Sequence, residues 1–115
     1  MIGIKRIYDP VNEYNGYRIL VDRIWPRGVS KDIAKLDLWM KEIAPSDALR
    51  KWFQHDPAKW DEFKIRYHDE LLEKKDLIAE LKRIERENKN VTLLYSAKDK
   101  EHNQAVALLE ILEEY

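Results

Sequence analysis

The hydrophobic positions of this chain fall into short runs rich in strand-forming residues and longer stretches with helical spacing. Residues 2–8, 17–23 and 91–95 are rich in β-branched and aromatic residues and are bounded by polar or turn-forming residues. These runs predict three strands, the first near a sheet edge and the last, which is the most apolar, at the centre. Residues 36–43 fit both helical spacing and strand alternation, and we favour a fourth strand there.

Helical spacing of apolar residues predicts the remaining elements. One helix carries an apolar stripe made of Trp60, Phe63, Tyr67 and Leu71. We expect this stripe to be buried against the sheet. The spacing continues after a break near residues 75–76 and returns over residues 105–112. Polar residues predict where helices begin: Ser30 and Ser46 each start a short helix, and Asp99 starts the last one.

The alternation of strands and helices predicts an α/β fold. We expect a single small domain with a short, mostly parallel sheet of about four strands flanked by helices, rhodanese-like or Rossmann-like in outline. A chain of 115 residues is long enough to bury one core without disulfides or metals. No repeat or flexible linker divides it, so residues 1–115 are expected to form one domain.

Composition limits the classes of function. The chain has 21 Lys and Arg against 22 Asp and Glu, so any affinity for nucleic acid must come from a local patch. It has no cysteine, which excludes disulfides, thiolate nucleophiles and cysteine metal sites. No apolar run approaches the ~20 residues of a membrane span, and the first residues do not form a signal peptide. We therefore expect a cytoplasmic protein with no membrane partner; the sequence does not indicate an oligomeric state.

The first candidate site follows the second predicted strand, where open α/β sheets bind ligands. Arg23 and Arg27 match the geometry of a carboxylate or phosphate, and Gly28 lets a ligand approach the backbone. Trp25 is expected to line the pocket, and Asp22 is a candidate acid–base group. Alternatively, Asp22 pairs internally with one of the arginines and Trp25 packs in the core.

The second candidate site is the polar loop after the last predicted strand. It contains Lys98, Asp99, His102 and Asn103. We expect this loop to lie within contact range of the first segment, because both segments leave carboxyl ends of strands in one sheet. The backbone amides at a helix N-terminus favour an anion, and His102 is a second candidate acid–base group. Alternatively, Asp99 merely caps a helix and His102 faces solvent.

Metal and cofactor motifs are missing from the sequence. The three histidines, His55, His68 and His102, have no recognised ligand spacing, so we expect no metal site. No phosphate-binding P-loop or dinucleotide glycine motif occurs, and no cofactor is indicated. His55 beside Asp56 is typical of a helix boundary, and it stays a secondary candidate for ligand binding.

Several unusual clusters, in a fixed order, carry a resemblance to a known family. They are residues 18–28 (RILVDRIWPRG), 44–46, 49–50, 52–53 and 55–57, then Trp60, Phe63 and Tyr67, and finally residues 93–95 and 102–103. With them the chain resembles the YeaO-like branch of the domain of unknown function 488 family. The resemblance implies a compact bacterial or archaeal cytoplasmic α/β domain without an established activity. Longer members carry a cysteine and a final arginine near the last strand; both are absent here, so their roles do not carry over.

A weaker likeness concerns the rhodanese-type sheet. It rests on a strand that ends in an Asp-Arg pair and a later strand that leads through a loop into a helix. Rhodaneses and the related phosphatases need a cysteine in that loop, and this chain has none. Sulfur transfer and cysteine-phosphate chemistry are therefore excluded.

Two hypotheses about function follow. The first is a protein that binds a small anionic, phosphate-bearing molecule at the strand ends, as an enzyme without thiol chemistry or as a binding protein. The alternative is a nucleic-acid-binding or regulatory protein with a basic patch and two tryptophans. That patch would comprise Arg18, Arg23, Arg27, Lys31, Arg50, Trp25 and Trp52. The near-neutral net charge and the lack of a helix-turn-helix pattern argue against it.

Overall fold

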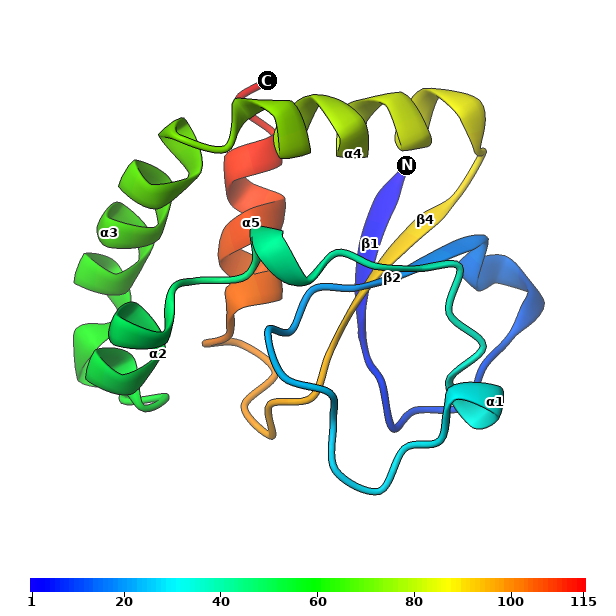
Figure 1. Ribbon diagram of the computed structural model, residues 1–115, viewed down its shortest axis with the longest axis horizontal. Helices are drawn as coiled ribbons and strands as arrows, with labels where there is room; N and C mark the ends of the chain where they lie inside the picture. The colour runs from blue at the N-terminus through cyan, green and yellow to red at the C-terminus, as the bar shows by residue number, and fades with distance from the viewer.

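The computed structural model describes residues 1–115, and its elements alternate between strands and helices (Figure 1). The strands are β1 (Ile2–Arg6), β2 (Tyr17–Leu20), β3 (Leu38–Trp39) and β4 (Val91–Tyr95). The helices are α1 (Lys31–Ala34), α2 (Asp47–Phe53), α3 (Trp60–Leu72), α4 (Lys75–Glu87) and α5 (Gln104–Leu112). Short 3-10 turns are η1 (Glu13–Asn15), η2 (Lys41–Ile43) and η3 (Pro57–Lys59). No helix is long and apolar enough to cross a membrane.

The four strands form one parallel sheet in the order β1-β4-β2-β3. β4 pairs on both sides, so that Leu93 lies between Ile4 of β1 and Ile19 of β2. This arrangement confirms the α/β class, the central position of the strand at residues 91–95 and the edge position of the first strand. Because all strands run in one direction, their carboxyl ends meet at one edge of the sheet.

The fourth strand is much shorter than the sequence pattern predicts. Only Leu38 and Trp39 pair with β2, and the amide of Met40 makes one further bond to the Leu20 carbonyl (2.9 Å). The chain then tightens into η2, where Ile43 donates to the carbonyl of Met40 (3.2 Å). The ambiguous pattern of residues 36–43 therefore reflects both conformations, strand first and helical turn afterwards.

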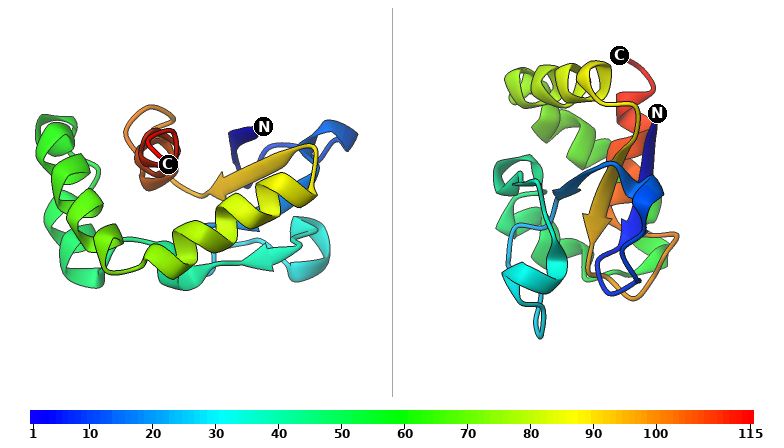
Figure 2. Two further views of the ribbon diagram at one scale, coloured as in Figure 1. Left: turned by 90° about the horizontal axis from the view of Figure 1, so that it is seen from above. Right: turned by 90° about the vertical axis from the view of Figure 1, so that its right-hand side faces the viewer.

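Alternate residues of the sheet face two separate hydrophobic clusters. Ile19 and Leu93 face the larger cluster, which α2, α3, α4 and α5 complete. Leu20 and Leu94 face a smaller cluster that includes Ala34 of α1. In the left view of Figure 2, α3 and α1, which belong to different clusters, lie at opposite ends of the molecule. A buried residue on both faces explains why β4 reads as a continuous apolar run.

The aromatic stripe of α3 is buried among helices. Phe63, Tyr67 and Leu71 are at most 1% exposed, and Trp60 is partly buried. The stripe is buried as predicted, but its predicted packing partner is wrong. The main contacts of α3 are with α2, α4 and α5 rather than with the sheet. The Tyr67 hydroxyl donates to the Ile43 carbonyl (2.7 Å), so α3 also holds the turn that leads to α2.

Helix caps and one glycine set the turns between elements. Ser30 and Ser46 accept hydrogen bonds from the amides of Ile33 and Leu49, as N-caps of α1 and α2. Gly16 has φ 64°, and a side chain there would collide with the Asn90 carbonyl, to which the next residue, in β2, donates a hydrogen bond.

Candidate functional site

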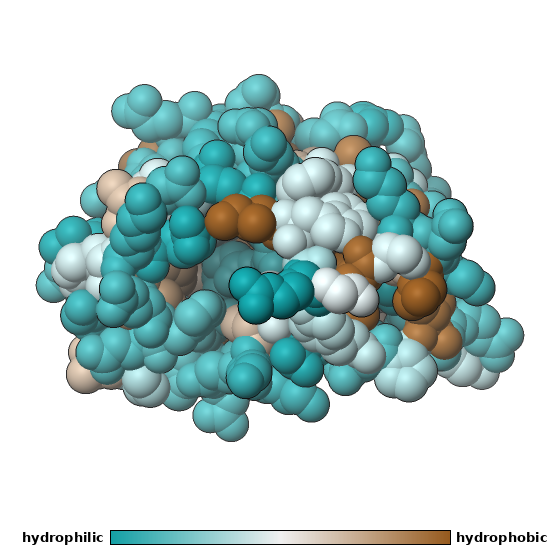
Figure 3. Space-filling model, turned by 60° about the horizontal axis from the view of Figure 1, so that its bottom comes forward, coloured by the Kyte–Doolittle hydropathy of each residue, from teal (hydrophilic) through white to brown (hydrophobic).

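A cavity of about 340 Å³ opens at the carboxyl edge of the sheet. Figure 3 views the molecule from this side and shows a hollow with strongly hydrophilic and strongly hydrophobic side chains next to each other. The lining comes from the segment after β2, the turn before α2, the C-terminal end of α2 with the residues after it, α3, and the segment after β4. Its residues are Asp22–Arg27, Ala44, Pro45, Arg50, Phe53, His55, Phe63, Ser96, Ala97 and Gln104.

Asp22 is the buried carboxyl group of this cavity. It is 8% exposed, and each of its oxygens accepts one hydrogen bond from a neutral side chain. The Ser96 hydroxyl donates to Oδ2 at 2.5 Å, and the Gln104 amide donates to Oδ1. No arginine lies within ion-pair distance of Asp22, so the alternative of an internal Asp22–arginine pair is wrong.

Burial raises the pKa of the Asp22 carboxyl above its ordinary value. The hydrogen bonds from Ser96 and Gln104, and the nearby His55, act in the opposite direction but are weaker than the desolvation. A carboxyl group in this state accepts hydrogen bonds from a ligand and can exchange a proton nearer to neutral pH than an exposed aspartate does.

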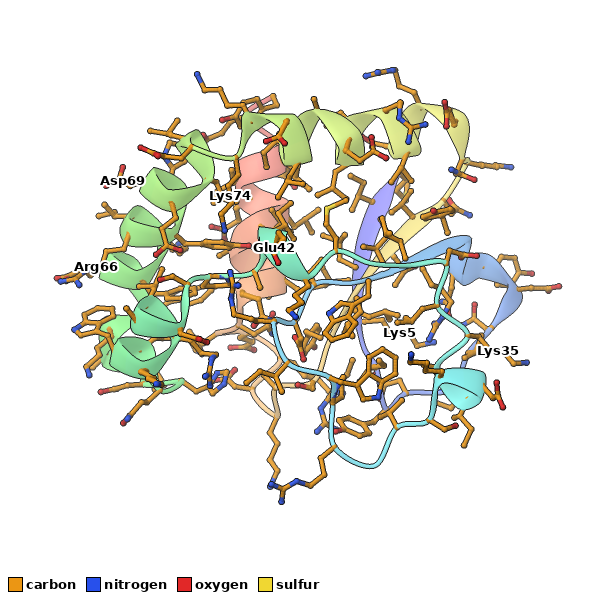
Figure 4. The ribbon with its side chains drawn as sticks, in the orientation of Figure 1. Lys5, Lys35, Glu42, Arg66, Asp69 and Lys74 are labelled. Atoms are coloured by element: carbon orange, nitrogen blue, oxygen red, sulfur yellow. The ribbon has the colours of Figure 1, made fainter.

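Arg23 is used mainly to build the wall of the cavity. Its guanidinium donates to the carbonyls of Pro45 (2.9 Å) and Ala44 (3.0 Å), and it is 4.0 Å from a Glu42 carboxylate oxygen. Lys74 binds the same turn: its Nζ donates to the carbonyls of Glu42 (2.7 Å) and Ala44 (3.3 Å) (Figure 4). Burial lowers the pKa of Lys74, and the neighbouring Arg23 lowers it further.

The mouth of the cavity is cationic. Arg27 and Arg50 are exposed there and give it this charge, and His55 is exposed beside them. The Arg27 guanidinium makes no hydrogen bond or ion pair within the chain; only its backbone carbonyl is used, as acceptor for the Tyr8 hydroxyl (2.8 Å). Arg50 makes a single contact with the exposed Asp47 at 3.3 Å, which is weak in water. These cations are therefore available to a ligand.

An unusual backbone conformation places His55 at this mouth. Gln54 (φ 47°) and His55 (φ 55°) are both left-handed, which is rare for residues other than glycine. They reverse the chain directly after α2, and the His55 ring lies 5.7 Å from the ring of Phe53 in the cavity lining. His55 was only a secondary candidate on sequence grounds, and the fold puts it beside the first candidate segment.

The loop after β4 has a different role from the one predicted for it. Asn103 is fully buried and caps α5, accepting from the amides of Ala105 and Val106. Asp99 is not the cap of α5; it accepts from the amides of Glu101 and His102 one turn earlier. The free amides that an anion would need are thus occupied by side chains of the loop itself.

None of the four residues predicted from this loop lines the cavity. Lys98 is exposed, and the His102 ring contacts Asp99 (2.9 Å) and the ring of Trp60 (5.4 Å). Gly28 also lies outside the lining, where its φ of 76° serves a turn. The loop does meet the first segment, but through Ser96, Ala97 and Gln104.

The basic patch of the alternative hypothesis does not form. Arg18 is 4% exposed and donates to the Ala34 carbonyl and to Asn15 (2.7 Å), and burial lowers its pKa. Trp52 is covered by Arg66, whose guanidinium lies 4.2 Å from the ring centre. Trp25 is half-buried and its indole donates to the Val29 carbonyl (2.6 Å), so it forms a wall of the cavity rather than an exposed platform.

Sequence reasoning missed several residues of the cavity. The sequence pattern singled out neither Ser96 nor Gln104, and it indicated Arg50 only as part of a basic patch. Phe53 and Phe63 read as ordinary helix core, and their rings do stack, with centres 4.2 Å apart. The one available signal was position: Ser96 directly follows the central strand, and Gln104 begins the helix after it.

No group of three or more His, Cys, Asp or Glu side chains is arranged to hold a metal ion. His68 lies on the far part of α3 and contacts Glu114 at 3.2 Å, away from the other two histidines. What the cavity offers is a buried carboxyl group with hydroxyl and amide neighbours, apolar walls and a cationic mouth.

The entire chain, residues 1–115, matches the family described as the inactive DUF488-N3 subclade. The chain belongs to this family. Among DUF488 relatives, the uncharacterized protein YeaO of Escherichia coli K12 is 43% identical over 111 residues, which cover 96% of each chain. Uncharacterized proteins of Mycobacterium bovis and Mycobacterium tuberculosis are 42% identical over 83 residues, covering 72% of this chain and 70% of each relative. No solved structure matches the chain.

The family assignment confirms the DUF488 resemblance inferred from the motifs. The match to YeaO extends over nearly the whole of both chains. Their names state no ligand or reaction.

Proposed function

We propose that this protein binds a small, phosphate-bearing anion in the cavity at the carboxyl edge of its sheet. The observation that carries the proposal is the unbalanced positive charge of the lining. Three arginines, Arg23, Arg27 and Arg50, stand against one carboxyl group, Asp22. The guanidinium fork of an arginine matches phosphate oxygens in geometry and charge, so an anion at the mouth would balance this excess.

The three arginines differ in their contacts within the protein, and this indicates different roles. Arg23 is anchored to backbone carbonyls and keeps the wall in place, which gives the cavity a defined shape. Arg27 has no partner of its own, and Arg50 has only a solvent-exposed one. A bound phosphate would supply the missing partner for Arg27 at little cost, because no internal contact must be broken.

Size and polarity support a small molecule. A volume of about 340 Å³ is at the lower end of ligand pockets and excludes a duplex or a large cofactor. Apolar walls with a few polar groups are typical of such pockets. The family description "inactive" supports binding rather than turnover, and the absence of cysteine agrees with it.

Calorimetric titration of the full chain with inorganic phosphate, at low and at physiological salt, tests the proposal. We expect Arg27→Ala and Arg50→Ala each to weaken binding about tenfold, since a charge-assisted hydrogen bond is worth about 1.5 kcal/mol or more. Arg86→Ala is the matched control, because Arg86 is an exposed arginine on α4 without an ion pair. An equal loss in the Arg86 variant, or no binding by the wild type, overturns the proposal.

A further inference from the structure

The inner end of the cavity differs in chemistry from its mouth. The exposed cations Arg27 and Arg50 stand at the mouth, whereas the buried group inside is the carboxyl of Asp22. No ion pair joins the two ends, so the charges are spatially separate. An inorganic phosphate ion would bind the arginines at the mouth and make no contact with the carboxyl group of Asp22.

Asp22 retains acceptor capacity that the protein does not use. The two carboxylate oxygens together have four acceptor positions; the side chains of Ser96 and Gln104 fill one on each oxygen, and the Ser96 backbone amide supplies a third donor, so one position is left for a ligand. Asp22 is also part of the cavity lining. A group that enters the cavity and donates a hydrogen bond therefore finds a carboxyl acceptor that is already oriented by its neighbours.

Apolar side chains share the lining with these charged groups. Trp25 and Phe63 line the cavity, together with Phe53, and the indole N–H of Trp25 is already bonded to the Val29 carbonyl. The Phe53 and Phe63 rings stack on each other, 4.2 Å between centres and 21° between planes, so they form one wall rather than a slot. A ligand that fills the cavity would thus contact rings and aliphatic atoms as well as charged groups, which favours an apolar body.

We propose that the ligand is a phosphate monoester with an apolar body whose far end carries a hydrogen-bond donor, a hydroxyl or an amino group, that binds to Asp22. This inference rests on the proposed function, because the phosphate must occupy the mouth for the far end to reach the inner carboxyl. A ligand with an apolar far end would cover the remaining acceptor position of Asp22 without filling it, which is unfavourable for a buried carboxyl group. Asp22 is then the residue that determines specificity.

Three esters that differ only at the far end test the inference on the wild-type chain. They are benzyl phosphate, 4-(hydroxymethyl)benzyl phosphate and 4-(aminomethyl)benzyl phosphate, with the same end groups on a butyl chain as a second series of different length. We expect the hydroxyl or the amino ester to bind at least tenfold more tightly than the ester with no donor. Which of the two binds better identifies the end group, since an ammonium gains most from an ionised carboxylate.

The variant Asp22→Asn keeps the shape of the side chain and removes its charge. We expect the preference for the amino ester to fall below threefold, while benzyl phosphate binds as well as before or better, because the cavity has lost its negative charge. Asp69→Asn is the matched control: Asp69 is exposed on α3, away from the cavity lining, and should leave the preference intact (Figure 4). Circular dichroism of each variant checks that it is folded.

The outcomes separate this inference from the proposed function. If all three esters bind as tightly as inorganic phosphate or one another, the far-end contact is wrong while anion binding stands. If neither phosphate nor any ester binds, both are wrong. A preference for the amino ester that is undiminished in Asp22→Asn also overturns the inference, because that ester would then gain nothing from the carboxyl group of Asp22.

Discussion

The two segments that leave β2 and β4 end at the same edge of the sheet, yet they use their polar residues in opposite ways. After β2, Arg27 has no internal partner and Asp22 keeps an unused acceptor position. After β4, the side-chain oxygens of Asp99 and Asn103 accept hydrogen bonds from backbone amides of their own loop and of α5. The first segment is therefore open to a ligand, and the second is closed on itself.

The two aspartates show the difference most directly. Burial raises the pKa of Asp22, because its neighbours compensate only in part for the lost water. Hydrogen bonds from the Glu101 amide and from His102 lower the pKa of Asp99. Asp99, whose carboxylate is stabilised by its own loop, has a structural role. Asp22 has lost water that its protein neighbours replace only in part, so it is suited to bind a ligand.

Removal of the Asn103 side chain should have the largest effect. Asn103→Ala removes the cap of α5 from a fully buried position and leaves the partly buried Asp99 carbonyl without its donor, so we expect a loss of about 2–3 kcal/mol in the free energy of unfolding. Urea denaturation measures it, and phosphate affinity of the folded variant should stay within twofold. The control is Ser30→Ala, which removes the cap of the short, exposed α1 and should cost under about 1 kcal/mol. Equal losses in both variants would contradict a special role for the closed loop.

The pH dependence of stability should have opposite signs at the two aspartates. A carboxyl group with a raised folded pKa contributes stability that is lost as pH rises from the ordinary value of 3.8 through the folded pKa, which is the case of Asp22. Asp99, with a lowered folded pKa, contributes stability that is lost as pH falls below 3.8.

Denaturation curves of wild type, Asp22→Asn and Asp99→Asn between pH 3 and pH 7 would show this. The stability of wild type relative to Asp22→Asn should fall with rising pH, and relative to Asp99→Asn it should rise. Parallel curves for the two variants would mean that the two segments do not differ as described.

Removal of the Arg27 side chain should have the smallest effect on stability. Arg27→Ala breaks no internal contact of the guanidinium, so the free energy of unfolding should change by less than about 0.5 kcal/mol. Thermal unfolding with and without millimolar phosphate measures both properties, and the stabilisation by phosphate should shrink. A loss of about 3–5 kcal/mol would instead indicate a buried ion pair that this structure does not contain.

Part of the candidate site followed from the sequence. Polar residues after a β-rich run predicted that Asp22 and Trp25 lie at the carboxyl edge, and parallel strands bring the residues after β4 to the same edge. Which of those later residues face the cavity did not follow, because Asp99 reads equally as a ligand-binding group and as a cap. The contribution of Arg50 and His55 depends on where α2 ends, and that depends on the two left-handed residues after it.

Local pattern determined the strands, the buried stripe of α3 and the absence of thiol chemistry, because hydrophobic period and residue type act over neighbouring positions. The tertiary structure alone decided that residues 36–43 divide into a short strand and a turn, that Arg18 is buried, and that α3 packs on helices. It also decided which polar groups stay free. A hydrogen bond such as Ser96 to Asp22 joins residues that lie 74 positions apart, and only the folded chain brings them together.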